Sequence, residues 1–120
     1  RSDGMIVATP TGSTGYSLAS GGPILDAEMR ALIITPICPF TLSNRPVVTG
    51  EKEIVLEVLE HQRTDIVLTV DGQVLYELKE NDKIVVEMSS KRLRLIHSTK
   101  RNFTEVIREK LHWAGDMRNA

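Results

Sequence analysis

The 120-residue sequence lacks most features that assign a protein to a special class at once. It has one cysteine, Cys38, so an internal disulfide framework is excluded, and its three histidines show no metal-ligand spacing with that cysteine. Aromatic residues make up 4% of the chain, and no uninterrupted apolar run exceeds four residues. A membrane-spanning helix needs roughly 20 such residues, so the sequence predicts neither a bilayer-spanning segment nor a structural zinc site.

An excess of charge of one sign is also missing. Fifteen Lys and Arg residues against sixteen Asp and Glu residues give a formal net charge of −1. Without a general positive field we expect no nucleic-acid partner and no membrane partner. The 41% hydrophobic content suits one globular domain over residues 1–120. Because the first residue is Arg rather than Met and the dipeptide Asp3-Gly4 of a turn follows at once, we interpret the sequence as a segment cut from a longer chain.

Most of the chain alternates apolar with polar residues, which is the period-two pattern of strands. The dipeptide Asp71-Gly72 between two such runs predicts a hairpin with a type I′ turn, because that turn needs positive φ at both central positions. The sequence predicts about seven or more strands, in the runs 5–9, 32–38, 53–60, 65–70, 74–76, 83–88 and 92–97.

One helix is predicted near the end of the chain, where Phe103, Val106, Ile107 and Leu111 recur at spacings of three and four. Asn102 and Glu105 have the spacing of a capping box, and Gly115 follows as a stop signal. The predicted fold class is therefore mainly β: an antiparallel β-sandwich-like domain with a short C-terminal helix. The apolar stripe of that helix needs a partner surface, which could be this sheet or a second domain.

Residues 9–23 combine four glycines with six Ser and Thr side chains, a density that ordinary turns do not need. Glycine allows a ligand to approach the backbone closely, and free N–H groups with small hydroxyls can donate to phosphate or ribose oxygens. The segment matches neither the Walker A pattern, nor G-x-G-x-x-G, nor the G-x-S-x-G nucleophile elbow. A nucleotide site is the functional interpretation. The alternative is a glycine-rich connection whose hydroxyls cap a helix from about Tyr16.

Several motifs together closely resemble the C-terminal part of NAD kinases, over nearly the whole chain. The resemblance implies an enzyme that transfers the γ-phosphoryl of ATP to the 2′-hydroxyl of the adenosine ribose of NAD, giving NADP in the cytoplasm. The matching stretches are Arg1-Ser2-Asp3-Gly4, Ile6 to Leu18, Gly21-Gly22-Pro23-Ile24, Pro36-Ile37-Cys38-Pro39, Asn44-Arg45-Pro46 and Asp71-Gly72-Gln73.

Family members also carry a Gly-Gly-Asp-Gly motif, whose Asp acts on the ribose hydroxyl, and an Asn-Glu pair in an N-terminal α/β domain. Neither motif occurs in this sequence. The resemblance therefore implies a two-domain parent in which this chain binds NAD and builds the interface of a homodimer or homotetramer. ATP and its divalent cation, Mg, are expected to bind mainly outside this segment, and the segment alone is predicted to be inactive.

The resemblance assigns dinucleotide binding to particular residues and no catalytic or metal-binding role to any residue of this chain. The Asp3 carboxylate would accept hydrogen bonds from the nicotinamide amide or its ribose, and the Tyr16 ring could stack on a base. Gly15 departs from the alanine commonest in the family, and Phe40 replaces a common histidine. The implied NAD-binding residues are Arg1, Asp3, Thr14, Gly15, Tyr16, Ser17, Leu18, Ala19, Cys38 and Gln73.

Two other functions compete with this interpretation. A non-catalytic nucleotide-sensing or oligomerisation module could keep the loop without the chemistry. A lipid kinase of the same wider fold group would share the two-domain plan, but it needs a larger apolar cavity and explains residues 9–16 less well. Formation of NADP from ATP and NAD by the full-length protein would separate all three.

Overall fold

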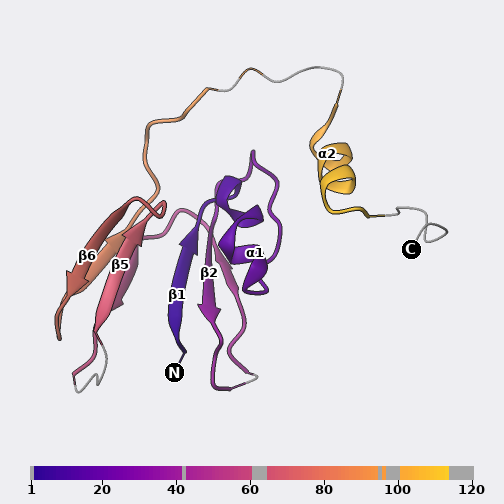
Figure 1. Cartoon of the computed structure of the whole chain (residues 1–120). Helices are drawn as coiled ribbons and strands as arrows, with labels where there is room; N and C mark the ends of the chain where they lie inside the picture. The colour runs from indigo at the N-terminus through magenta and orange to yellow at the C-terminus, as the bar shows by residue number, and fades with distance from the viewer. Residues whose placement is uncertain (1, 42, 61–64, 95, 97–100, 114–120) are drawn as a thin grey trace. The chain divides into compact units, whose positions relative to one another are not determined.

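The computed structural model describes residues 2–41, 43–60, 65–94, 96 and 101–113. The chain divides into two compact units, one of residues 1–50 with 89–120 and the other of residues 51–88. The described residues form seven strands, paired only antiparallel, and a short helix near the end of the chain (Figure 1). The predicted mainly β fold class is confirmed, and the extent of a single domain over residues 1–120 stays a prediction.

A three-stranded antiparallel sheet organises the first unit. Its strands β1 (Gly4–Ala8), β2 (Leu32–Ile37) and β3 (Val47–Thr49) lie in that order, with β2 in the centre. β2 is rich in β-branched residues, which favour strands, and its Ile33 is fully buried. Ile33 forms a core cluster with Leu25 and Ala31. The buried central strand therefore provides a fixed base for the segments around it.

Between β1 and β2 the chain makes two very short helices, the 3-10 helix η1 (Thr11–Thr14) and the α-helix α1 (Tyr16–Ala19). In Figure 1 this violet segment lies beside the β1–β2 pair. Gly15 occupies the N-cap position of α1, which has no side-chain cap, whereas the Gly12 N–H of η1 donates to Thr9 Oγ1 at 3.2 Å. The predicted start of a helix at about Tyr16 is therefore confirmed, whereas the predicted capping of that helix by a hydroxyl side chain is wrong.

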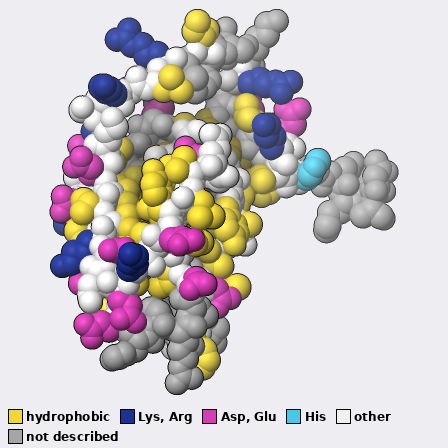
Figure 2. Space-filling model, turned by 60° about the vertical axis from the view of Figure 1, so that its left-hand side comes forward, with side chains coloured by type: hydrophobic (Ala, Val, Ile, Leu, Met, Phe, Trp, Pro, Cys, Tyr) yellow, Lys and Arg dark blue, Asp and Glu magenta, His cyan; other side chains and the backbone are white. Residues whose placement is uncertain are grey.

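The second unit consists of two antiparallel strand pairs. β4 (Ile54–Glu57) pairs with β7 (Lys83–Val86), and β5 (Ile66–Val70) pairs with β6 (Val74–Leu78). At the hairpin, Asp71 and Gly72 have φ values of 50° and 68°, as the predicted type I′ turn requires. The hairpin prediction is confirmed. Apolar side chains also lie at the surface of the molecule, beside Asp and Glu side chains (Figure 2).

The helix near the end of the chain, α2 (Phe103–Lys110), begins at the predicted capping box. The Glu105 N–H donates to Asn102 Oδ1 and the Asn102 N–H to Glu105 Oε2, both at 2.9 Å. Helical residues end at Lys110, before the predicted stop at Gly115, which lies outside the described residues. No helix in the described part of the chain is long and apolar enough to cross a membrane.

Two strand predictions differ from the structure. The strand predicted over 92–97 is absent from its described residues, because Leu93 and Ile96 are almost fully exposed and pair with no other strand. Leu95 and His97 lie outside the described residues. The strand β3, by contrast, was not predicted, since three residues after Pro46 are too few to establish an alternating pattern.

Candidate functional site

The glycine-rich loop, defined here as residues 9–23, is a succession of tight turns. Its backbone bonds include Ser13 N to Pro10 O at 3.1 Å, Gly15 N to Gly12 O at 3.0 Å and Ser20 N to Tyr16 O at 3.0 Å. Each turn satisfies donors within the loop itself, so the loop folds compactly without strand pairing. Its position over β2 then depends on a few longer-range contacts.

The first of these contacts is made by Ser13, whose side chain is fully buried. Its hydroxyl donates to the carbonyl oxygen of Pro10 at 2.5 Å and accepts from the Leu25 N–H at 3.1 Å. The second bond ties the start of the loop to the chain beyond its end. A buried hydroxyl with both bonds made is a structural group, because it has little capacity left for a ligand.

The second contact joins Ser17 of α1 to Thr35 of β2. Their hydroxyl oxygens lie 2.8 Å apart, and the two residues are 1% and 0% exposed. Gly22 lies directly beside this pair. A Cβ at Gly22 would overlap Ser17 Oγ and lie 2.8 Å from the Ser17 carbonyl oxygen and 2.9 Å from Thr35 Oγ1. Only glycine fits here without displacing the buried pair.

The opposite side of the loop is open to solvent. Tyr16 is 65% exposed, and Thr14, Gly15 and Ala19 are also exposed, whereas Leu18 is half-buried. We call the four exposed residues the outer strip. It combines an aromatic ring suited to stacking with backbone that a ligand can approach at Gly15. The structure thus brings five of the predicted residues together on one segment, with Ser17 directed inward beneath them.

Asp3 and Cys38 lie together at one end of the β1–β2 pair. The Asp3 N–H donates to the Ile37 carbonyl oxygen at 2.9 Å, and Gly4 pairs with Ile37. Both predicted residues are exposed. Cys38 has φ 44°, a left-handed conformation that is costly for a residue with a Cβ. The Asp3 carboxylate and the left-handed backbone of Cys38 therefore lie next to each other at this end of the sheet.

The remaining predicted residues lie elsewhere. Gln73 belongs to residues 51–88, where it is exposed and its N–H donates to Val70 O at 3.0 Å. Arg1 lies outside the described residues. Phe40 is 86% exposed. Among the described residues no group of three or more His, Cys, Asp or Glu side chains is arranged to hold a metal ion.

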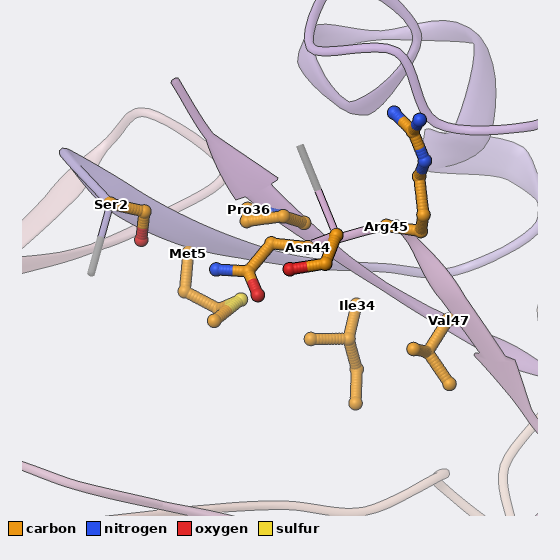
Figure 3. A pocket seen from close by; sticks show the side chains of 8 residues that line it. Ser2, Met5, Ile34, Pro36, Asn44, Arg45 and Val47 are labelled. Carbon is orange, nitrogen blue, oxygen red and sulfur yellow. The ribbon is translucent and has the colours of Figure 1, made fainter. Parts of the chain in front are cut away.

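Two structural features escaped the sequence interpretation. One is the burial of Ser13 and Thr35, because the sequence alone does not show whether a Ser or Thr side chain in a loop or strand is buried. The other is a groove of about 440 Å³ on the face of the sheet opposite to Thr35. In Figure 3 the side chains of Met5, Ile34 and Val47 extend in one direction, while Arg45 points away from them. Asn44 and Arg45, which line this groove, belong to the Asn44-Arg45-Pro46 motif of the resemblance.

Comparison with known proteins identifies the family. Residues 1–98 match the model of the ATP-NAD kinase C-terminal domain. The chain is 51% identical over 115 residues to an NAD kinase of Magnetococcus marinus, and 48% identical over 113 residues to an NAD kinase of Geobacter sulfurreducens. These matches cover 95% and 94% of this chain, but 38% and 40% of the relatives. The chain thus spans about two-fifths of their length.

The fold agrees with the same family. The crystal structure of yeast NADH kinase complexed with NADH matches this chain with a TM-score of 0.83 at 29% sequence identity. The match covers 99% of this chain and 38% of the yeast chain. The chain therefore belongs to the ATP-NAD kinase family and corresponds to its C-terminal domain.

Proposed function

We propose that the complete protein containing this chain is an NAD kinase, and that this chain supplies its dinucleotide-binding surface. The observation that carries the proposal is the outer strip, an exposed Tyr16 on a glycine-rich loop anchored to a buried strand, in a chain of this family. The NADH bound to the yeast relative adds support for a dinucleotide rather than a lipid as the ligand.

In the proposed reaction, the 2′-hydroxyl oxygen of NAD attacks the γ-phosphorus of ATP. The bond between the γ-phosphorus and its bridging oxygen breaks, ADP leaves, and the hydroxyl proton passes to an Asp that we place in the other part of the protein. Such phosphoryl transfer depends mainly on positioning and charge neutralisation. A chain that only holds the acceptor therefore still contributes to the rate.

The residues of this chain would divide that task between two places. Tyr16 and its neighbours on the outer strip would contact the adenosine end, with the phenol oxygen left in solvent. Asp3, as an acceptor-only group when ionised, would bind the amide N–H of nicotinamide or a ribose hydroxyl. Cys38 would present its backbone beside Asp3, and Gln73 would also contact the dinucleotide. Mg and ATP would bind mainly outside this chain.

We further propose that residues 51–88 form part of a subunit interface in a homodimer or homotetramer. Eight large apolar side chains of this unit are exposed, and exposed apolar surface of this extent favours association with another surface. They are Val55, Leu59, Val67, Val70, Val74, Leu75, Tyr76 and Val85. Leu75→Glu should shift the complete protein to a smaller assembly in analytical ultracentrifugation. An unchanged sedimentation coefficient would place the interface elsewhere.

The binding proposal is tested by titrating the complete protein with NAD and with NADH in a calorimeter. Tyr16→Ala should weaken binding about tenfold, the value of one lost stacking contact, while Tyr16→Phe should bind like the wild type. Asp3→Asn should also weaken binding. Wild-type affinity in both Tyr16→Ala and Asp3→Asn would contradict the assigned site. Absence of NADP after incubation of the wild-type protein with ATP and NAD would contradict the kinase assignment itself.

A further inference from the structure

We propose that Thr35, in the middle of β2, is a positioning residue for the dinucleotide and acts through Ser17. The inference rests on the proposed function, because it concerns the same loop. Thr35 does not belong to the outer strip and is 0% exposed, so it would touch no ligand itself. Its role would be to fix the loop in the conformation that presents Tyr16.

The first step of the argument concerns the strength of the link. The Ser17 and Thr35 hydroxyls lie 2.8 Å apart and both residues are buried, so water does not compete for either hydroxyl. A hydrogen bond in such surroundings is stronger than one at the surface, and a lost partner leaves a buried hydroxyl unsatisfied. The link therefore favours one position of α1 over its alternatives.

The second step concerns how the link reaches the ligand-facing side. Ser17 is the second residue of α1, a helix of four residues that no side chain caps. A helix this short has little stability of its own, so its orientation depends on what holds it to the sheet. Ser17 follows directly on Tyr16, and its carbonyl oxygen accepts the Gly22 N–H at 2.8 Å. Movement at Ser17 would therefore move Tyr16.

The third step separates positioning from plain stabilisation. If Thr35 merely stabilised the fold, its loss would lower the melting temperature and affect both substrates alike. If it positions the outer strip, its loss would raise the KM for NAD selectively, since we place ATP mainly outside this chain. Preorganisation of a binding loop lowers the entropic cost of ordering it when the ligand binds. The two roles thus differ in which KM changes.

The experiment compares four variants of the complete protein by steady-state kinetics with NAD and ATP varied in turn. Thr35→Val keeps the shape and removes the hydroxyl, and it should raise the KM for NAD about fivefold to tenfold with the KM for ATP unchanged. Ser17→Ala should do the same. Thr35→Ser keeps the hydroxyl and should restore the wild-type KM. The double variant should be no worse than the worse single one, because it leaves no unpaired hydroxyl.

An unchanged KM for NAD in soluble Thr35→Val, or an equal rise of both KM values, would overturn the proposal. Should Thr35→Val fail to fold, the KM for NAD of Ser17→Ala decides in its place. Failure of this inference is distinguishable from failure of the proposed function. In the first case Tyr16→Ala still weakens NAD binding while the Thr35 variants do not, and in the second the wild-type protein makes no NADP.

Discussion

Residues 1–50 and residues 51–88 differ in what they bury. The first region buries polar side chains, Ser13, Ser17 and Thr35, around a sheet whose Ile33 is inaccessible to solvent. In the second region Ile54 and Val58 are the buried side chains among the described residues. Buried hydroxyls specify one arrangement, because each must find its partner. Hydrogen bonds of buried hydroxyls therefore fix the glycine-rich loop of the first region, whereas the second region leaves many of its apolar side chains exposed.

The two regions also differ in the kind of contact that holds them. In the first, hydrogen bonds join Ser13 to Leu25 and Ser17 to Thr35, which lie 12 and 18 residues apart. In the second, backbone strand pairing holds the unit: β5–β6 closes around a tight turn at Asp71 and Gly72, and β4 pairs with β7, which lies farther along the chain. Local contacts follow from local sequence, whereas a long-range hydroxyl pair does not. The proposed binding function lies in the region that sequence patterns describe less well.

The largest expected difference between the regions comes from apolar truncation. Ile33→Ala should lower the free energy of unfolding by about 3 kcal/mol, because Ile33 is 0% exposed and the loss leaves a cavity. Val67→Ala, at a half-exposed strand position, should lower it by less than about 1 kcal/mol. Urea unfolding of the two variants measures both values. Equal losses would show that Val67 packs as tightly as Ile33, and the contrast between the regions would fail.

Two glycines of the first region, Gly22 and Gly50, test how tightly the loop packs on the buried hydroxyl pair. Gly22→Ala should destabilise the protein by about 2 kcal/mol, since its Cβ would press on the Ser17 backbone and the Thr35 hydroxyl. Gly50 is the matched control, because a Cβ there meets nothing within 4 Å. Gly50→Ala should change stability by no more than about 0.5 kcal/mol. Similar melting temperatures for both variants would mean that the loop yields easily at Gly22.

What the sequence predicted was mainly what neighbouring residues determine. The turn at Asp71 and Gly72 and the capping box of Asn102 and Glu105 were both confirmed, because each is a local interaction encoded within four residues. The density of glycines and hydroxyls in residues 9–23 located the candidate site, and the resemblance then assigned NAD binding to its residues. The roles of its residues in NAD binding stay predictions.

What the sequence did not predict depends on distant partners. Thr35 belongs to an apolar strand and gives no sign that its hydroxyl meets Ser17, and Ser13 was one of six similar hydroxyls in its segment. The strand predicted near Leu93 is wrong because a distant partner is missing rather than present. Its alternating pattern requires a partner strand, and the described residues of this chain provide none for Leu93 or Ile96.

Backbone strain at one residue of each region should give a smaller difference in stability. Cys38 and Asp71 both have positive φ, at 44° and 50°, one in each region. Cys38→Gly should stabilise the protein by about 1 kcal/mol, because it removes the Cβ that disfavours this conformation. Asp71→Gly should gain much less, since Asp tolerates the left-handed conformation in turns. Cys38→Ala is the control and should gain nothing. Equal gains for the two glycine variants in thermal unfolding would contradict a special strain at Cys38.

The smallest expected effect concerns charge on the second region. Lys83 Nζ and Glu57 Oε1 lie 3.6 Å apart across the β4–β7 pair, with side chains 60% and 48% exposed. A double-mutant cycle with Lys83→Ala and Glu57→Ala should give a coupling of about 0.3 kcal/mol, and 1 M salt should abolish it. A similar cycle on Ser17 and Thr35 should give about 1 kcal/mol and no salt dependence. The coupling energy of the Ser17–Thr35 pair should be larger than that of the Lys83–Glu57 pair, because burial excludes the water that would compete for the hydroxyls. A larger coupling energy for the ion pair would contradict this comparison of the two regions.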